Sequence, residues 1–249
     1  MSISNLYGAE LAKVFDTMYQ GFIAYDEEFQ FYTTKAEKIG VDSILEIGCG
    51  TGNLARYLAA HFKHYLGIDL SEHMLQLARE KNPEVPFMQA DMRNFSTEKR
   101  FDLALITGRS SSYLVSHTDL TDTFDAIAQA LRPKAHLIFD CIDADRFIPY
   151  IEKNPRVVHN AKVGELKFRR NSYWHIENKA ENLVNWTADY YKLEGIHQVK
   201  LGQDQVIFKA FTQNEMEALL TQTGYEVIHM EDRPSYAFDT FVVHAQKKR

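Results

Sequence analysis

Carboxylates that follow or interrupt short apolar runs are the residues of this sequence best placed to do chemistry. Glu46 lies inside one such run, and Asp69 and Asp91 each close a later one. Glycines follow Glu46 at alternate positions, as Gly48, Gly50 and Gly52. Glycine lets the backbone come close to a ligand. Negative charge beside such a turn favours a ligand with positive charge.

The elements that must position these carboxylates are predicted to be strands alternating with helices. Strands are expected over 43–47, 65–70, 85–90, 101–107 and 136–141, with helices over 54–60, 71–81 and 119–131. This alternation predicts a parallel sheet that is covered on both faces. Ligands of such sheets bind beyond the carboxyl ends of the strands, where strand order reverses. The glycine turn, Asp69, Asp91 and the loop from Gly108 are therefore expected to meet at one crevice.

Composition predicts one domain that acts on small molecules. The 249 residues, 45% of them hydrophobic, suffice for one full core, and the net charge of −6 argues against a nucleic-acid backbone as the main partner. Two cysteines and ten scattered histidines predict neither a disulfide framework nor a metal site. No apolar run approaches the ~20 residues of a membrane span, and no secretory pattern is present, so the expected location is the cytoplasm.

Two segments outside the parallel core differ from it in pattern. Residues 1–40 are predicted to be helical and rich in aromatic side chains, which either pack on the core or form a lid over the ligand. Residues 146–211 show strand alternation and predict an antiparallel insertion, while 41–145 form the binding core and 212–249 supply a helix and an antiparallel edge pair. The polar face of the insertion, with Tyr173 and His175, either lines a substrate pocket or faces solvent.

The glycine turn distinguishes between two kinds of cofactor. A helix N-terminus behind such a turn suits the anionic part of a ligand. A dinucleotide-binding turn has a third glycine where this chain has Asn53, and Glu46 offers nothing to a pyrophosphate. A nicotinamide-dependent oxidoreductase is therefore the less favoured interpretation.

The run Leu45 to Gly52 resembles motif I of the class I S-adenosylmethionine-dependent methyltransferases, and Asp69, Asp91-Met92 and Phe101-Asp102-Leu103 match later motifs in order. The resemblance implies a Rossmann-like α/β fold with a seven-stranded, mostly parallel sheet and an antiparallel edge. It implies that Glu46 and the turn hold the methionine part, that Asp69 accepts from the ribose and that Met74 packs on the adenine. The implied cofactor-binding set is Tyr19, Glu46, Gly48, Cys49, Gly50, Asp69, Leu70, Met74, Asp91, Met92, Thr107 and Gly108.

The aromatic N-terminus and the strand-rich insertion resemble the branch that contains glycine N-methyltransferase and the deoxyaminosugar N-methyltransferases. Tyr19 matches the tyrosine of that branch's helical lid. One departure is Arg132-Pro133-Lys134-Ala135, where the family usually has two glycines after the proline.

The predicted function is transfer of a methyl group from S-adenosylmethionine to nitrogen or oxygen of a small metabolite by in-line displacement, with S-adenosylhomocysteine as product. Candidate substrate contacts are Arg109, Tyr113, Tyr173 and His175. Arg109 equally suits a structural ion pair, and His175 is as typical of a surface as of a general base. A non-catalytic binding or scaffold protein of the same fold is the main alternative. A homodimer is compatible with the sequence, and no metal, nucleic acid or membrane is expected.

Overall fold

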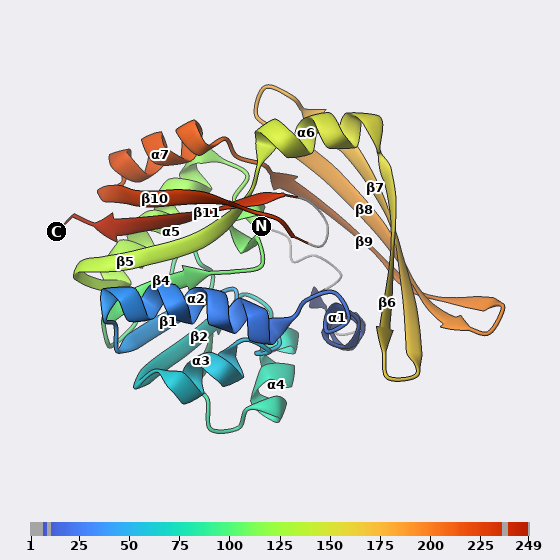
Figure 1. The fold of residues 1–249 in the computed structure, drawn as a ribbon, viewed down its shortest axis with the longest axis horizontal. Coiled ribbons are helices and arrows are strands. Elements are labelled where there is room, and N and C mark those ends of the chain that lie inside the picture. The colour runs from blue at the N-terminus through green and yellow to red at the C-terminus, as the bar shows by residue number, and fades with distance from the viewer. Residues whose placement is uncertain (1–6, 9–10, 236–238, 249) are drawn as a thin grey trace.

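The computed structural model, which describes residues 7–8, 11–235 and 239–248, contains two β-sheets, and the smaller sheet stands to one side of the larger one (Figure 1). The larger sheet has the order β10-β11-β5-β4-β1-β2-β3. Its strands are β1 (Ser43–Ile47), β2 (His64–Asp69), β3 (Phe87–Gln89), β4 (Phe101–Ile106), β5 (Leu131–Ile142), β10 (Tyr225–Arg233) and β11 (Thr240–Lys247). Strands β1 to β5 pair in parallel, whereas β11 is antiparallel to both neighbours. The predicted α/β class with an antiparallel edge is confirmed.

Helices cover both faces of the larger sheet because its strands are apolar on both sides. One face packs on α2 (Tyr25–Ile39) and α3 (Ala55–His61) through Ile44, Leu105 and Ile138. The other packs on α5 (His117–Ala130) and α7 (Gln213–Gln222), whose first turns are capped by Ser116 and Thr212. Helix α4 (Glu72–Lys81) follows β2, and Ser71 caps it as predicted, since its Oγ accepts from the Met74 N–H.

The smaller sheet consists of four antiparallel strands in the order β6-β7-β8-β9. They are β6 (Arg156–Val163), β7 (Leu166–Asn178), β8 (Leu183–Glu194) and β9 (His197–Lys209). Its inner face packs on α1 (Ala12–Tyr19) and α6 (Ala144–Lys153) around a cluster that includes Trp174, Trp186 and Phe208. Helix α1 lies between the two sheets, at the side where the strands of the larger sheet end (Figure 1).

Several boundaries differ from the sequence-based expectation. The helical N-terminus is broken between α1 and α2, and residues 1–6 and 9–10 of the expected segment lie outside the described residues. Helix α6 and strand β6 were not predicted: Pro149 lies inside α6, and β6 has a mostly exposed edge position that weakens its pattern. At the departure noted above, Lys134 adopts a φ of 61°, a conformation that glycine usually supplies. No described helix is long and apolar enough to cross a lipid bilayer.

Candidate functional site

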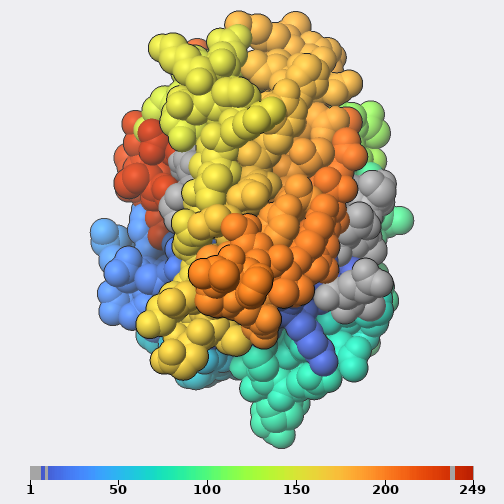
Figure 2. Space-filling view, turned by 90° about the vertical axis from the view of Figure 1, so that its right-hand side faces the viewer, coloured from blue at the N-terminus to red at the C-terminus, as the bar shows by residue number. Residues whose placement is uncertain are grey.

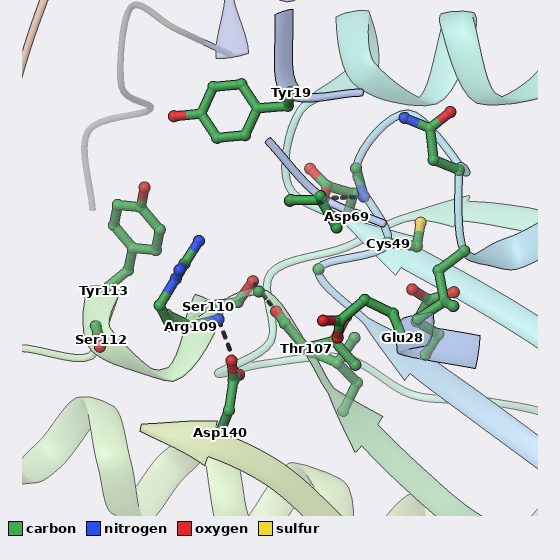
Figure 3. Close-up of a pocket in the computed structure, with 18 of the residues that line it drawn as sticks. Tyr19, Glu28, Cys49, Asp69, Thr107, Arg109, Ser110, Ser112, Tyr113 and Asp140 are labelled. Carbon is green, nitrogen blue, oxygen red and sulfur yellow. Dashed lines mark hydrogen bonds between the residues drawn. The ribbon is translucent and has the colours of Figure 1, made fainter. Parts of the chain in front are cut away.

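A cavity of about 750 Å³ lies between the two sheets, beyond the carboxyl ends of β1, β2, β4 and β5. Strand order reverses between β1 and β4, so this is the position at which open α/β sheets bind ligands. Every residue of the implied cofactor-binding set lines the cavity. Arg109 and Tyr113 also line it, and Figure 3 shows their side chains projecting into the same space as Tyr19 and Asp69. The predicted meeting of distant segments at one crevice is therefore present.

The glycine turn is held by backbone geometry that a side chain would disturb. Gly48 has a φ of 73°, in the left-handed region, and a Cβ placed there would lie 2.6 Å from Ser110 Oγ. The N–H groups of Gly48 and Cys49 both donate to the Ile68 carbonyl, at 2.8 and 3.0 Å. The turn is thereby fastened to the end of β2.

These hydrogen bonds correct the expectation of an anion-binding turn. The Gly48 and Cys49 N–H groups already have the Ile68 carbonyl as partner, and the Gly50 N–H donates to Asp69 Oδ2 at 2.9 Å. N–H groups that already donate to these partners are not available to a pyrophosphate. The carboxylates of Glu46 and Asp69 also line the cavity at this turn. The geometry favours a ligand without phosphate at this turn.

Asp69 is fixed at the end of β2 by two peptide groups. One carboxylate oxygen accepts from Gly50 N and the other from Ser71 N, each at 2.9 Å. A carboxylate has about four acceptor positions, so each oxygen retains one toward the cavity. Burial raises the pKa of Asp69, although the peptide N–H groups act in the opposite direction. Two adjacent hydroxyl donors match what remains of this carboxylate.

Glu46 brings a second buried carboxylate to the floor of the cavity. It is 1% exposed, and Tyr65 donates its hydroxyl hydrogen to Glu46 Oε2. Burial raises the pKa of Glu46 to about 7, against the lowering effect of the Tyr65 hydrogen bond, and Asp69 raises it further. A buried carboxylate with that pKa is stabilised in its charged form by a cationic ligand.

The third carboxylate of the set has a different environment. Asp91 pairs with Arg93, which donates from Nε and Nη2 and also bonds Asp119. The hydrogen bond from Arg93 lowers the pKa of Asp91. Leu70, Met74 and Met92 line the cavity beside it and supply the apolar surface that a planar base requires.

Asn53, which replaces the third glycine of a dinucleotide turn, ties the N-terminal helix to the turn. Asp16 of α1 accepts from Asn53 Nδ2 at 3.1 Å and from the Thr51 hydroxyl. Lys81 of α4 forms an ion pair with the same carboxylate. This cluster of Asp16, Thr51, Asn53 and Lys81, named the α1 latch below, holds Tyr19 over the cavity.

The loop after β4 carries the two sequence-predicted substrate contacts that the cavity contains. Arg109 adopts a φ of 64°, and its Nη1 donates to Ser235 Oγ at 3.2 Å. The Tyr113 hydroxyl lies 2.6 Å from that of Tyr7, which joins this loop to the N-terminal segment. Thr107 and Gly108 line the cavity immediately before this loop.

Tyr173 and His175 lie on the wrong face of the smaller sheet for substrate contact. Both side chains are exposed on the outer face and neither lines the cavity, because successive residues of β7 alternate between faces. Their neighbours Arg170 and Trp174 face inward instead. Arg170 is only 3% exposed, donates to the Tyr19 hydroxyl at 2.7 Å and lies over the Trp186 ring. A charged residue on a strand face that also carries Phe168 and Trp174 was the signal that could have identified it.

Further cavity residues were missed by sequence reasoning. Asp140 lies near the carboxyl end of β5, in a position analogous to that of Asp69 on β2, so the same rule could have found it. Glu28 of α2 and Arg233 of β10 form a bidentate ion pair at the cavity wall, with N to O distances of 2.8 and 3.0 Å. These two residues are 205 positions apart, and only the tertiary structure brings them together.

Comparison with known proteins places this geometry among methyltransferases. A family described as "Methyltransferase domain" matches residues 44–134. YqeM of Bacillus subtilis (strain 168), which carries the provisional name of a methyltransferase, is 33% identical over 135 residues, 49% of this chain and 55% of that protein. The chain thus spans about half the length of this relative.

Other similarities extend over nearly the whole chain. The dTDP-3-amino-3,4,6-trideoxy-alpha-D-glucopyranose N,N-dimethyltransferase of Streptomyces venezuelae is 24% identical over 92% of this chain and 96% of that protein. A solved structure of CalS10 with S-adenosylmethionine bound, an amino pentose methyltransferase from Micromonospora echinaspora, has a TM-score of 0.78 and 20% identity and covers 94% of this chain and 96% of that one. The latter likeness shows that both sheets belong to a shared fold.

Proposed function

We propose that this chain is a class I S-adenosylmethionine-dependent methyltransferase and that it transfers a methyl group from S-adenosylmethionine to a nitrogen of a small metabolite. S-adenosylhomocysteine is then the second product. The observation that carries the proposal is a single cavity with two unlike ends: one is lined by the glycine turn and Asp69, the other by Arg109, Tyr113 and the inner face of the smaller sheet.

The residues at the first end fit the cofactor. Asp69 retains acceptor positions for the two ribose hydroxyls, and Glu46 offers negative charge to the amino group of the methionine part. Leu70, Met74 and Met92 provide an apolar slot for the adenine, with Asp91 at its edge. When bound, the cofactor supplies an activated methyl group on a sulfonium sulfur.

The task that remains for the protein is alignment and exclusion of water. The α1 latch places Tyr19 above the cavity, and Arg170 bonds the Tyr19 hydroxyl from the opposite sheet. Trp174 and Trp186 stack at 5.7 Å and close the far wall with Phe208. Rigid walls that bring a nucleophile in line with the methyl group account for a large part of such rate enhancements.

Nitrogen of an amino sugar is the acceptor we favour over oxygen. A relative that is similar over 92% of this chain, smaller sheet included, is an N,N-dimethyltransferase, whereas the family model covers only residues 44–134 and leaves the smaller sheet out. The smaller sheet forms the acceptor wall, so similarity there bears on substrate class. A cavity of about 750 Å³ fits a small molecule rather than a nucleic acid.

A radiolabel assay tests the proposal. The chain is incubated with S-[methyl-³H]adenosylmethionine and dTDP-3-amino-3,4,6-trideoxy-α-D-glucopyranose, then with a panel of other amino sugars and small amines. We expect label in at least one amine and none in the matched hydroxyl compounds. Tight cofactor binding without transfer to any acceptor would instead support the non-catalytic alternative.

We also propose that two copies associate through the outer face of the smaller sheet. Three exposed apolar side chains, Val158 (57% exposed), Tyr173 and Ile207, lie on this face, which the yellow-to-orange strands turn toward the viewer in Figure 2. Light scattering is expected to give a dimer that Val158→Lys converts to a monomer. A wild-type monomer at all concentrations would refute this association.

A further inference from the structure

Asp140 presents a buried carboxylate to the acceptor end of the cavity. Its side chain is 7% exposed, lines the cavity and points toward the loop after β4 (Figure 3). The hydrogen bond that orients it is donated by the Arg109 backbone N–H to Oδ1, at 2.8 Å. This donor is a neutral peptide group, and a carboxylate has about four acceptor positions, so the charge remains available to a ligand.

The charges around Asp140 come from three other elements. Arg109 lies on the loop after β4, Glu28 and Tyr32 on α2, and Arg233 on β10. Arg233 makes its bidentate pair with Glu28, and the Arg109 guanidinium donates to Ser235. Burial raises the pKa of Asp140 to about 6; Arg109 and Arg233 act against this shift and Glu28 adds to it. A buried carboxylate in this setting favours a cationic or N–H donor partner.

We propose that Asp140 binds the amine of the methyl acceptor and takes up the proton that the nitrogen loses after methylation. This inference rests on the proposed function and names the residue that selects an amine. The acceptor reacts after its ammonium form has lost a proton to solvent. The lone pair of the neutral amine then forms the new C–N bond while the C–S bond breaks and its electron pair stays on sulfur. One N–H proton of the resulting ammonium then passes to an Asp140 oxygen.

The proton transfer would allow one site to methylate the same nitrogen more than once. Loss of the proton to Asp140 leaves a neutral N-methyl amine with its lone pair restored. A second transfer can follow once Asp140 has released its proton to solvent and the cofactor has been exchanged. A carboxylate whose pKa lies near the working pH is a better base than an exposed aspartate. A hydroxyl acceptor differs, because its proton must leave as attack occurs, which requires a stronger base.

Binding of simple probes tests the inference without turnover. Cyclohexylamine, which is protonated at neutral pH, and its neutral isostere cyclohexanol are titrated into the chain with S-adenosylhomocysteine bound. We expect the wild type to bind the ammonium at least about tenfold more tightly than the alcohol at pH 7.5. Asp140→Asn should abolish the preference, and Glu27→Gln, which removes an exposed carboxylate at the same cavity, should retain it.

A pH series on the wild type keeps the inference testable if Asp140→Asn does not fold. The probe stays protonated between pH 5 and 8, so its preference over cyclohexanol should fall as the pH drops through about 6, where Asp140 gains a proton. Equal binding of both probes at every pH, or a preference that survives in Asp140→Asn, would overturn the inference. Failure of the proposed function is distinct, because it would appear as no methyl transfer in the radiolabel assay. Methyl transfer with an unchanged kcat/KM pH profile in Asp140→Asn would overturn the inference alone.

Discussion

At the scale of single residues, Glu46 links ligand binding to the stability of the chain. Its folded-state pKa of about 7 lies above its ordinary value of 4.5, because burial penalises the charged form. The folded state therefore binds the proton more tightly than the unfolded state. It follows that the unliganded chain loses free energy of unfolding as the pH rises from 4.5 through 7. A cationic ligand offsets this loss.

We predict that Glu46→Gln stabilises the unliganded chain at pH 8 and weakens S-adenosylmethionine binding. The neutral amide removes the buried charge, so the free energy of unfolding should rise by about 1–3 kcal/mol at pH 8 and by nearly nothing near pH 4. Urea unfolding of both proteins across this range measures the difference. Burial lowers the pKa of His159 and of His244 to about 4. Both histidines are present in both proteins, so their contributions to the free energy of unfolding cancel when the two proteins are compared at the same pH. A variant that is less stable at pH 8, or that binds the cofactor normally, would contradict the assignment.

Gly48 is a residue whose substitution separates backbone strain from a steric clash. Gly48→Ala forces a left-handed φ on alanine and places Cβ 2.6 Å from Ser110 Oγ. The control Gly164→Ala, in the turn between β6 and β7, has a φ of 57° and open space around its Cβ. We expect the control to lose about 1–2 kcal/mol of unfolding free energy and Gly48→Ala about 2–4, with loss of cofactor binding. Equal losses with intact binding would refute the role of the turn.

At the scale of elements, the α1 latch is what makes the N-terminal helix part of the site. Asp16 of α1 bonds Thr51 and Asn53 next to the glycine turn, and its partner Lys81 comes from α4. Burial lowers the pKa of the Lys81 ammonium, while the Asp16 hydrogen bond raises it. The helix is thereby coupled to the glycine turn that lines the cavity.

Asp16→Ala should loosen α1 without unfolding the larger sheet. Amide hydrogen exchange of Ala12–Tyr19 is expected to accelerate about tenfold or more, and S-adenosylmethionine should dissociate faster. The control Asp26→Ala removes an exposed carboxylate from the start of α2 and should leave exchange in α1 unchanged. Unaltered α1 exchange in Asp16→Ala would show that other contacts hold the helix.

The elements also show which predictions a sequence supports and which it does not. The apolar strands and their alternation with helices predicted the larger sheet, and a carboxylate at a strand end predicted where Asp69 lies. The orientation of the smaller sheet was not predictable in the same way. The alternation along β7 defines two faces of the strand, but it does not indicate which of them is turned toward the cavity. The polar face with Tyr173 and His175 was chosen as a candidate, whereas Arg170 faces the cavity. Pairs such as Glu28 with Arg233 depend on the tertiary structure alone.

At the scale of the whole molecule, the two sheets divide the work of the proposed reaction. The larger sheet ends in the glycine turn, Glu46 and Asp69, and the smaller sheet closes the same cavity with Trp174 and Arg170. Neither sheet encloses the site by itself, and α1 joins them. A substitution at the glycine-turn end of the cavity should therefore weaken cofactor binding more than acceptor binding. A substitution on the inner face of the smaller sheet should do the reverse.

The central claim is that Asp69 and the glycine turn form a site for S-adenosylmethionine. Its most direct test is calorimetric titration of S-adenosylmethionine and NAD into the wild type, Asp69→Ala and Asp102→Ala. Asp102 is a matched control, because it accepts from Ser43 and Arg132 at the opposite end of the larger sheet. The predicted result is one S-adenosylmethionine per wild-type chain, affinity at least about tenfold weaker in Asp69→Ala, little change in Asp102→Ala and no NAD binding. Unchanged affinity in Asp69→Ala, or binding of NAD without S-adenosylmethionine, would contradict the claim.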